Sequence, residues 1–161
     1  MLHRRLFFLS GAALAACGPS EAASRSEAVF ADSPFRKIAD AEWKRRLSPL
    51  AYKVLRHEGT ERAGTSALNA EKRRGTYVCA GCELPLFKSQ WKYESGTGWP
   101  SFWQVIKPNI GTKRDLVMLI PRTEYHCARC LGHQGHVFDD GPQPTGLRYC
   151  NNGAALRFVA A

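Results

Sequence analysis

Residues 75–82 read Gly75-Thr76-Tyr77-Val78-Cys79-Ala80-Gly81-Cys82, and residues 127–130 read Cys127-Ala128-Arg129-Cys130. Both stretches contain a C-x-x-C pair, and two such pairs can supply the four thiolates of a tetrahedral zinc site. Because two intervening residues form a tight turn, both sulfurs of a pair point at one ion, and Gly81 can adopt the positive φ that such a turn uses. The ion would tie two distant hairpins together.

The two pairs have other interpretations. In an exported protein they could form disulfides. One pair could instead be a redox centre of the thioredoxin type, but neither pair lies between a strand and a helix, as that fold requires. The matched spacing favours one structural zinc ion per chain.

The chain after Gly75 has the composition of a β domain. Short segments rich in β-branched and aromatic residues are separated by Gly, Pro, Asn and Asp, which is typical of strands and turns. These segments are 76–78, 102–106, 116–120, 136–138, 147–149 and 156–159. We therefore expect a mainly β, antiparallel domain built around the structural zinc site.

Two short helices are predicted before this sheet. Asp40 is a suitable N-cap for a helix over 41–47. Ser48, followed by a proline, is a suitable start for a second helix. The apolar face of the second helix would consist of Leu50, Val54 and Leu55.

Residues 1–23 have the pattern of an export signal. A positive region that includes Arg4 and Arg5 precedes the apolar segment 6–16, which is too short to span a bilayer. The Arg pair resembles a twin-arginine signal. We expect residues 24–34 to form a linker, residues 35–160 to form the folded domain, and the protein to be exported to the periplasm or anchored facing it.

Cys17 gives the signal a second feature. The stretch Leu14-Ala15-Ala16-Cys17 resembles a bacterial lipoprotein box, in which the cysteine carries a lipid anchor. Two alternatives stay open: ordinary cleavage after Ala23, which would discard Cys17, or an apolar N-terminal helix of a cytosolic protein.

The net charge of +9 over 161 residues raises the question of a polyanion partner. However, the basic residues lie in small groups at 44–46, 72–74 and 113–114, with no run of six or more. This distribution favours a solvated basic surface over a nucleic-acid site.

Cys150 is the unassigned thiol of the predicted domain. The chain has six cysteines, of which four would bind the metal and Cys17 belongs to the signal. Arg148 lies two residues earlier, so in a strand both side chains share one face and the guanidinium would favour the reactive thiolate. Alternatively, Cys150 is a buried and inert cysteine. His133, His136 and Trp99, taken alone, are more typical of packing residues.

Taken together, these segments resemble the B-type methionine sulfoxide reductases, the peptide-methionine (R)-S-oxide reductases, which act on the R epimer of the sulfoxide. The resemblance covers roughly residues 35–159. It is carried by the segments 75–82 (GTYVCAGC), 85–87 (PLF), 95–102 (SGTGWPSF), 127–130 (CARC), 132–142 (GHQGHVFDDGP) and 144–152 (PTGLRYCNN).

The resemblance implies a role for each residue of the predicted site. Cys150 would be the nucleophile that attacks the sulfoxide sulfur and becomes a sulfenic acid. Trp99 would pack on the substrate methyl group. The residues that bind the sulfoxide oxygen and help to protonate it would be His133, His136 and Asn152, and those that shape the substrate site would be Arg148 and Asp140.

The sequence departs from the family pattern at three positions. Thr97 stands where many members carry a resolving cysteine, so we expect an external, thioredoxin-like thiol to reduce the Cys150 sulfenic acid. Gly153 stands where the family usually has Ser, and Gln134 where it usually has Leu.

The expected substrates are oxidised proteins or peptides, with free methionine sulfoxide left open. The expected role is repair of envelope proteins by a monomer that does not bind nucleic acid. Two other functions are alternatives: a basic zinc-ribbon protein that binds nucleic acid, and a structural envelope lipoprotein. The first conflicts with export and with scattered charge, and the second gives no reason for Cys150 beside Arg148 and Asn152.

Overall fold

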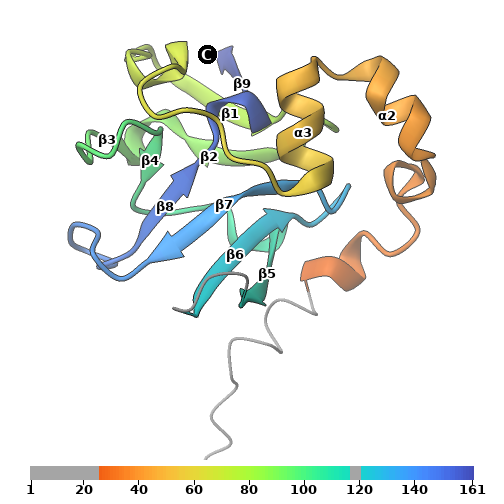
Figure 1. Cartoon of the computed structure of the whole chain (residues 1–161). Coiled ribbons are helices and arrows are strands. Elements are labelled where there is room, and N and C mark those ends of the chain that lie inside the picture. The colour runs from red at the N-terminus through yellow and green to blue at the C-terminus, as the bar shows by residue number, and fades with distance from the viewer. Residues whose placement is uncertain (1–25, 117–120) are drawn as a thin grey trace, which may run out of the picture.

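The computed structural model describes residues 26–116 and 121–161 (Figure 1). The helices are α2 (Asp40–Arg46) and α3 (Pro49–His57), and the 3₁₀ turns are η1 (Pro34–Lys37), η2 (Ala67–Asn69), η3 (Ser89–Trp91), η4 (Lys107–Asn109) and η5 (Gly153–Ala155). The strands are β1 (Gly75–Cys79), β2 (Pro85–Lys88), β3 (Lys92–Tyr93), β4 (Ser101–Phe102), β5 (Ile110–Asp115), β6 (Arg122–Cys127), β7 (His133–Phe138), β8 (Arg148–Asn151) and β9 (Leu156–Ala160). No helix within the described ranges has the length and apolar character that crossing a membrane requires.

The strands form two antiparallel sheets. One has the order β2-β1-β9 and the other the order β3-β4-β8-β7-β6-β5. Helix α3 packs against β7 and η5, and α2 lies farther from the sheets (Figure 1). The prediction of a mainly β, antiparallel domain with short N-terminal helices is confirmed.

Aromatic side chains join the two sheets into one core. Tyr77 and Phe87 come from the three-stranded sheet and Phe102 from the six-stranded sheet, and all three are fully buried. The Phe87 and Phe102 rings stack with centroids 4.1 Å apart, and Tyr77 meets Phe102 edge-on at 4.9 Å. Such pairs add about 0.5–1.5 kcal/mol beyond the area that they bury.

The structure confirms one predicted helix start and corrects the other. The Ser48 hydroxyl accepts a backbone N–H at the start of α3, as expected. Asp40 is not a cap, because Ala39 holds the cap position of α2 while the Asp40 carboxylate accepts a hydrogen bond from the Tyr52 hydroxyl at 2.5 Å. Leu50 was placed wrongly on the buried face of α3, since it is exposed.

One predicted strand was wrong in extent, and a second one is largely untested. The segment 102–106 contributes only Phe102 to strand β4, because the backbone N–H of Trp103 donates to the carbonyl of Trp91 in η3 and that of Ile106 to the carbonyl of Leu86 in β2 of the other sheet. In the segment 116–120, Leu116 is exposed and follows the end of β5, while residues 117–120 lie outside the described residues. Strands β5 and β6 went unpredicted because charged residues interrupt the β-branched and aromatic pattern, with three in a row at the end of β5.

Residues 26–34 make contacts with the domain. The Glu27 carboxylate lies 2.9 Å from His126 Nε2, and Phe30 packs against the core. The predicted signal, residues 1–23, lies outside the described residues, and the three domain boundaries stay predictions.

Candidate active site and metal centre

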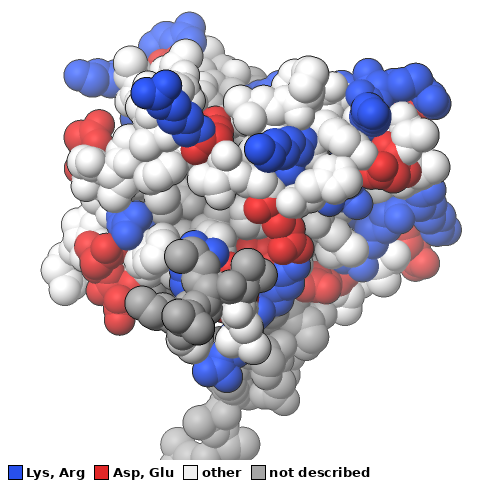
Figure 2. Space-filling view, in the orientation of Figure 1, with Lys and Arg blue, Asp and Glu red and all other residues white. Residues whose placement is uncertain are grey.

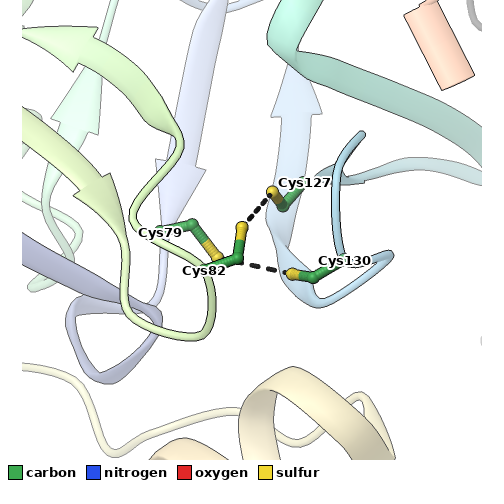
Figure 3. Close-up of side chains that lie close together, drawn as sticks. All are labelled: Cys79, Cys82, Cys127 and Cys130. Carbon is green, nitrogen blue, oxygen red and sulfur yellow. Dashed lines mark hydrogen bonds between the residues drawn. The ribbon is translucent and has the colours of Figure 1, made fainter. Parts of the chain in front are cut away.

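Four buried cysteines converge between two turns. Cys79 and Cys82 come from the β1–β2 turn, and Cys127 and Cys130 come from the β6–β7 turn (Figure 3). Their sulfur atoms all lie within 4.8 Å of one another. The four cysteines can therefore hold a metal ion.

The two turns share one backbone design. In each, the N–H of the residue after the second cysteine donates to the carbonyl of the first: Glu83 to Cys79 and Leu131 to Cys127, both at 2.8 Å. Glu83 and Leu131 both have positive φ, of 62° and 60°. The expectation that Gly81 supplies the positive φ was wrong, because Glu83 supplies it.

The sulfur separations decide against disulfides. Cys79 Sγ lies 3.6 Å from Cys130 Sγ, and Cys82 Sγ lies 3.4 Å from Cys127 Sγ, whereas a disulfide bond measures about 2.05 Å. In a tetrahedral zinc site with bonds of about 2.3 Å the sulfurs would be about 3.8 Å apart. The neighbouring Cys127 sulfur and burial raise the pKa of Cys130 well above the usual thiol value. A cation among the sulfurs would remove this penalty on the charged form.

Gln134 touches both the metal centre and the strand of the predicted nucleophile. Its fully buried side chain donates from Nε2 to Cys79 Sγ at 3.4 Å. Its backbone carbonyl accepts two hydrogen bonds from Asn152, one from the backbone N–H at 2.9 Å and one from Nδ2 at 3.0 Å. Within the part of the chain that the structure describes, Gln134 Oε1 has no hydrogen-bond partner.

A second group of side chains surrounds a cavity of about 130 Å³ at the predicted nucleophile. Its lining consists of Thr60, Trp99, Arg122, Gly135, His136, Phe138, Cys150, Asn151 and Asn152. The structure thus brings together four of the predicted site residues, Trp99, His136, Cys150 and Asn152. Thr60 and Arg122 were missed, because an isolated polar residue carries no sequence signal for a site, and Phe138 was given no role although it lies in the segment 132–142 that carries the resemblance.

Strand pairing positions the groups of the cavity. In the β7–β8 ladder, His136 pairs with Cys150, and paired residues present their side chains on the same face. Gly135 allows this close approach, because a Cβ at that position would overlap the backbone carbonyl of Cys150. The two predicted reactive groups are therefore neighbours across two strands.

Arg148, Asp140 and His133 do not line the cavity. The Arg148 guanidinium makes two hydrogen bonds of 2.8 Å to the Asp140 carboxylate and lies over the Phe138 ring at 4.3 Å. Arg148 and Asp140 therefore support Phe138, which is a cavity wall. His133 lies behind the wall, with its ring 5.6 Å from that of His136.

Each histidine is fixed by a carboxylate. His136 Nε2 lies 2.8 Å from the Asp115 carboxylate, which also pairs with Arg122 at 2.6 Å. His133 Nδ1 lies 2.8 Å from the buried Glu124 carboxylate. Burial lowers the pKa of His136, and lowers that of His133 to about 4. Both rings are therefore neutral at pH 7, each donating its N–H to the carboxylate.

Burial also has the largest effect on the pKa of the Cys150 thiol. It raises the pKa of Cys150 above the usual thiol value, although the Arg148 charge and hydrogen bonds from Thr97 and Arg148 act in the opposite direction. The expectation that Arg148 makes Cys150 a thiolate is therefore only partly met. In the resting state the thiol keeps its proton at neutral pH.

Comparison with known proteins identifies the family. A family model described as the SelR domain matches residues 47–160. The peptide methionine sulfoxide reductase MsrB of Leptospira interrogans is 53% identical over 121 residues, which is 74% of this chain and 92% of that protein. The chain belongs to the peptide methionine sulfoxide reductase B family.

Two further MsrB relatives agree. The MsrB of Bradyrhizobium diazoefficiens is 51% identical over 120 residues, covering 74% of this chain and 86% of that protein. The chloroplastic peptide methionine sulfoxide reductase B1 of Arabidopsis thaliana is 51% identical over 127 residues, covering 78% of this chain and 63% of that protein. The match therefore spans less than two thirds of the Arabidopsis protein. The predicted family is confirmed.

The structure gives this MsrB family member a reason for Gly153. Gly153 is buried directly after the cavity residue Asn152, and a Cβ on it would overlap the Ser66 side chain. Ser66 thus occupies the space that a side chain at position 153 would need. The glycine is therefore packed tightly at this position.

We predict that Gly153→Ser lowers the free energy of unfolding by about 1–3 kcal/mol, because the added atoms overlap Ser66. Adding Ser66→Gly should recover part of this loss. The double variant should therefore lose less free energy of unfolding than the two single variants lose when their losses are added. Urea unfolding of the wild type and the three variants measures this coupling. Strict additivity would show that the two positions do not compete for the same space.

Proposed function

We propose that this MsrB family member reduces methionine-R-sulfoxide, chiefly in oxidised proteins or peptides, through a sulfenic acid on Cys150. The observation that carries the proposal is the unligated Cys150 thiol in a small cavity with an indole wall. Trp99 forms this wall, and His136 and Asn152 lie beside the thiol. The relatives named above act, by their names, on peptide methionine sulfoxide.

The cavity supplies what the reaction requires. An indole face suits an S-methyl group, and a sulfur–aromatic contact contributes about 0.3–1.5 kcal/mol. The sulfoxide oxygen is a poor leaving group until it is protonated, so a proton must reach it in the transition state. One chiral arrangement of Trp99, the proton donor and Cys150 would accept one epimer of the sulfoxide.

The resting protonation states suggest where that proton comes from. Cys150 keeps its proton because burial raises its pKa, and His136 is neutral. As the Cys150 sulfur attacks the substrate sulfur, His136 would take the thiol proton and pass it to the sulfoxide oxygen, which Asn152 binds. His133, held by Glu124, would act behind His136 rather than on the substrate.

The transfer of oxygen from the sulfoxide to Cys150 requires no other oxidant. The S–O bond of the sulfoxide breaks and an S–O bond forms on Cys150, so that the methionine sulfur is reduced and the cysteine sulfur is oxidised by two electrons. One external thiol then displaces water from the sulfenic acid to form a mixed disulfide, and a second thiol releases Cys150.

The metal at the four-cysteine centre is proposed to be zinc, bound by Cys79, Cys82, Cys127 and Cys130. The ligand set is all sulfur, and the separations of 3.4 and 3.6 Å are close to those of a tetrahedral zinc thiolate site. When bound, zinc supplies structural cross-linking and takes no part in the reaction. A non-redox ion leaves Cys150 as the reacting sulfur.

The charge distribution does not favour a polyanion partner. On the face shown in Figure 2, Lys and Arg are interspersed with Asp and Glu, and they form no continuous basic stripe. Oxidised proteins, peptides and a thioredoxin-like thiol are therefore the proposed partners, and the monomeric state stays a prediction.

The central test compares wild type with Cys150→Ser on separated R and S sulfoxide peptides. We expect the wild type to reduce the R epimer, and Cys150→Ser to be at least about 10³-fold slower. Cys150→Ser should keep one zinc ion per chain by elemental analysis, whereas the matched control Cys79→Ser should lose it. Turnover by Cys150→Ser, or equal rates on both epimers, would refute the proposal.

A one-cysteine cycle predicts a sulfenic acid that persists without reductant, because Thr97 cannot resolve it. Enzyme treated with sulfoxide and then dimedone should carry the dimedone adduct on Cys150 in mass spectra, and Cys150→Ser should carry none. An intramolecular disulfide that includes Cys150 would contradict this cycle.

We further propose export by the twin-arginine route, lipidation at Cys17, and repair of oxidised envelope proteins. That route carries folded proteins, so zinc could be bound before the protein meets oxidants. The mature chain from envelope fractions should begin at a lipidated Cys17 by mass spectrometry, and Arg4→Lys with Arg5→Lys should block export. A mature chain that begins after Ala23 would rule out the anchor, and a cytosolic chain that begins at Met1 would rule out export.

A further inference from the structure

Glu61 is a buried acid that the reaction above does not use. It lies in the loop between α3 and η2 and is only 4% exposed. A buried carboxylate requires hydrogen-bond donors to offset the loss of water. Its two oxygens accept the backbone N–H groups of Gly153 and Ala154, the latter at 2.9 Å. The carboxylate is thereby attached to the turn that follows the nucleophile strand.

The backbone of Glu61 contacts two walls of the cavity. Its N–H donates to Asn152 Oδ1 at 3.0 Å, and its carbonyl accepts the indole Nε1–H of Trp99 at 3.1 Å. One Nδ2 hydrogen of Asn152 is used on the Gln134 carbonyl. With Oδ1 and one hydrogen fixed, the remaining amide hydrogen is available to the cavity that Asn152 lines.

The loop around Glu61 also supports the loop that carries Trp99. Gly64 N–H donates to the Gly98 carbonyl at 2.7 Å, and the side-chain amide of Asn69 donates to the same carbonyl at 2.9 Å. Gly98 has a φ of 88°, a conformation that favours glycine. Thr60, the neighbour of Glu61, is itself part of the cavity lining.

We propose that Glu61 is a positioning residue for sulfoxide reduction. Its carboxylate fixes the 60–64 loop against the turn after Cys150, and its backbone then holds the Trp99 indole and the Asn152 amide at set positions around the thiol. This inference rests on the proposed function. A small displacement of such groups lowers the reaction rate far more than it lowers the stability of the fold, since misplacement by about 1 Å can lower the rate about 100-fold.

The test uses the full-length protein with Glu61→Gln, which keeps the size of the side chain but directs an amide toward backbone N–H donors. We expect kcat/KM for a methionine-R-sulfoxide peptide to fall on the order of 10- to 100-fold, with a raised KM from the displaced indole. The matched control is Glu42→Gln, which removes a carboxylate of α2 paired with Arg46, away from the cavity, and should leave kcat/KM unchanged.

A double-mutant cycle separates positioning from simple loss of stability. Trp99→Phe removes the indole N–H that donates to Glu61, so Glu61→Gln should have a much smaller additional effect on KM in that background. Val54→Ala provides a second comparison, because it destabilises the buried face of α3 without contacting the cavity. Both variants are assayed at the same number of degrees below their own unfolding temperatures. If Glu61→Gln and Val54→Ala then lose equal activity, the inference is wrong.

Three further results would each test the role of Glu61 or the proposed function. If Glu61→Gln does not fold, Glu61→Asp takes its place, since it keeps the charge but shortens the reach, and wild-type kinetics for Glu61→Asp would overturn the inference. Fully additive effects of Glu61→Gln and Trp99→Phe on KM would also overturn it. A wild-type enzyme without activity on either epimer would instead refute the proposed function.

Discussion

The structure depends on the convergence of four sulfur atoms from two turns far apart in the chain. The β1–β2 turn belongs to the three-stranded sheet and the β6–β7 turn to the six-stranded sheet, so a metal held by all four cysteines cross-links the two sheets. Because four thiolates this close together would repel one another, a cation among them would stabilise their charged form. Such a cross-link would act together with the aromatic core that joins the same two sheets.

The metal centre is also linked to the turn that follows the strand of Cys150. The N–H of Ala80, inside the first C-x-x-C turn, donates to the carbonyl of Ala155 in η5 at 2.8 Å. Gln134 bonds Cys79 through its side chain and Asn152 through its backbone. The four metal-binding sulfurs and the Cys150 sulfur thus have different roles. A few hydrogen bonds connect the parts of the chain that carry them.

Burial sets the chemistry of the cavity. It raises the pKa of Cys150 and lowers the pKa values of His133 and His136, so the site rests with a neutral thiol and neutral imidazoles. The thiol proton is therefore held beside a neutral His136 across the β7–β8 ladder. Arg148, which the sequence suggested as the activator, is largely committed to Asp140 and to the wall residue Phe138.

The sequence by itself determined the family and the mainly β architecture. It also divided the cysteines of the domain into a group of four and the single Cys150. These features could be predicted because C-x-x-C spacing and motif order can be read along the chain. Only the tertiary structure decided which residues surround Cys150 besides the predicted Trp99, His136 and Asn152. Glu61, Thr60 and Arg122 reach the cavity, or the residues that line it, through loop packing and strand pairing, which no local pattern encodes. Burial likewise depends on the whole fold, and therefore so does the protonation state of each group in the site.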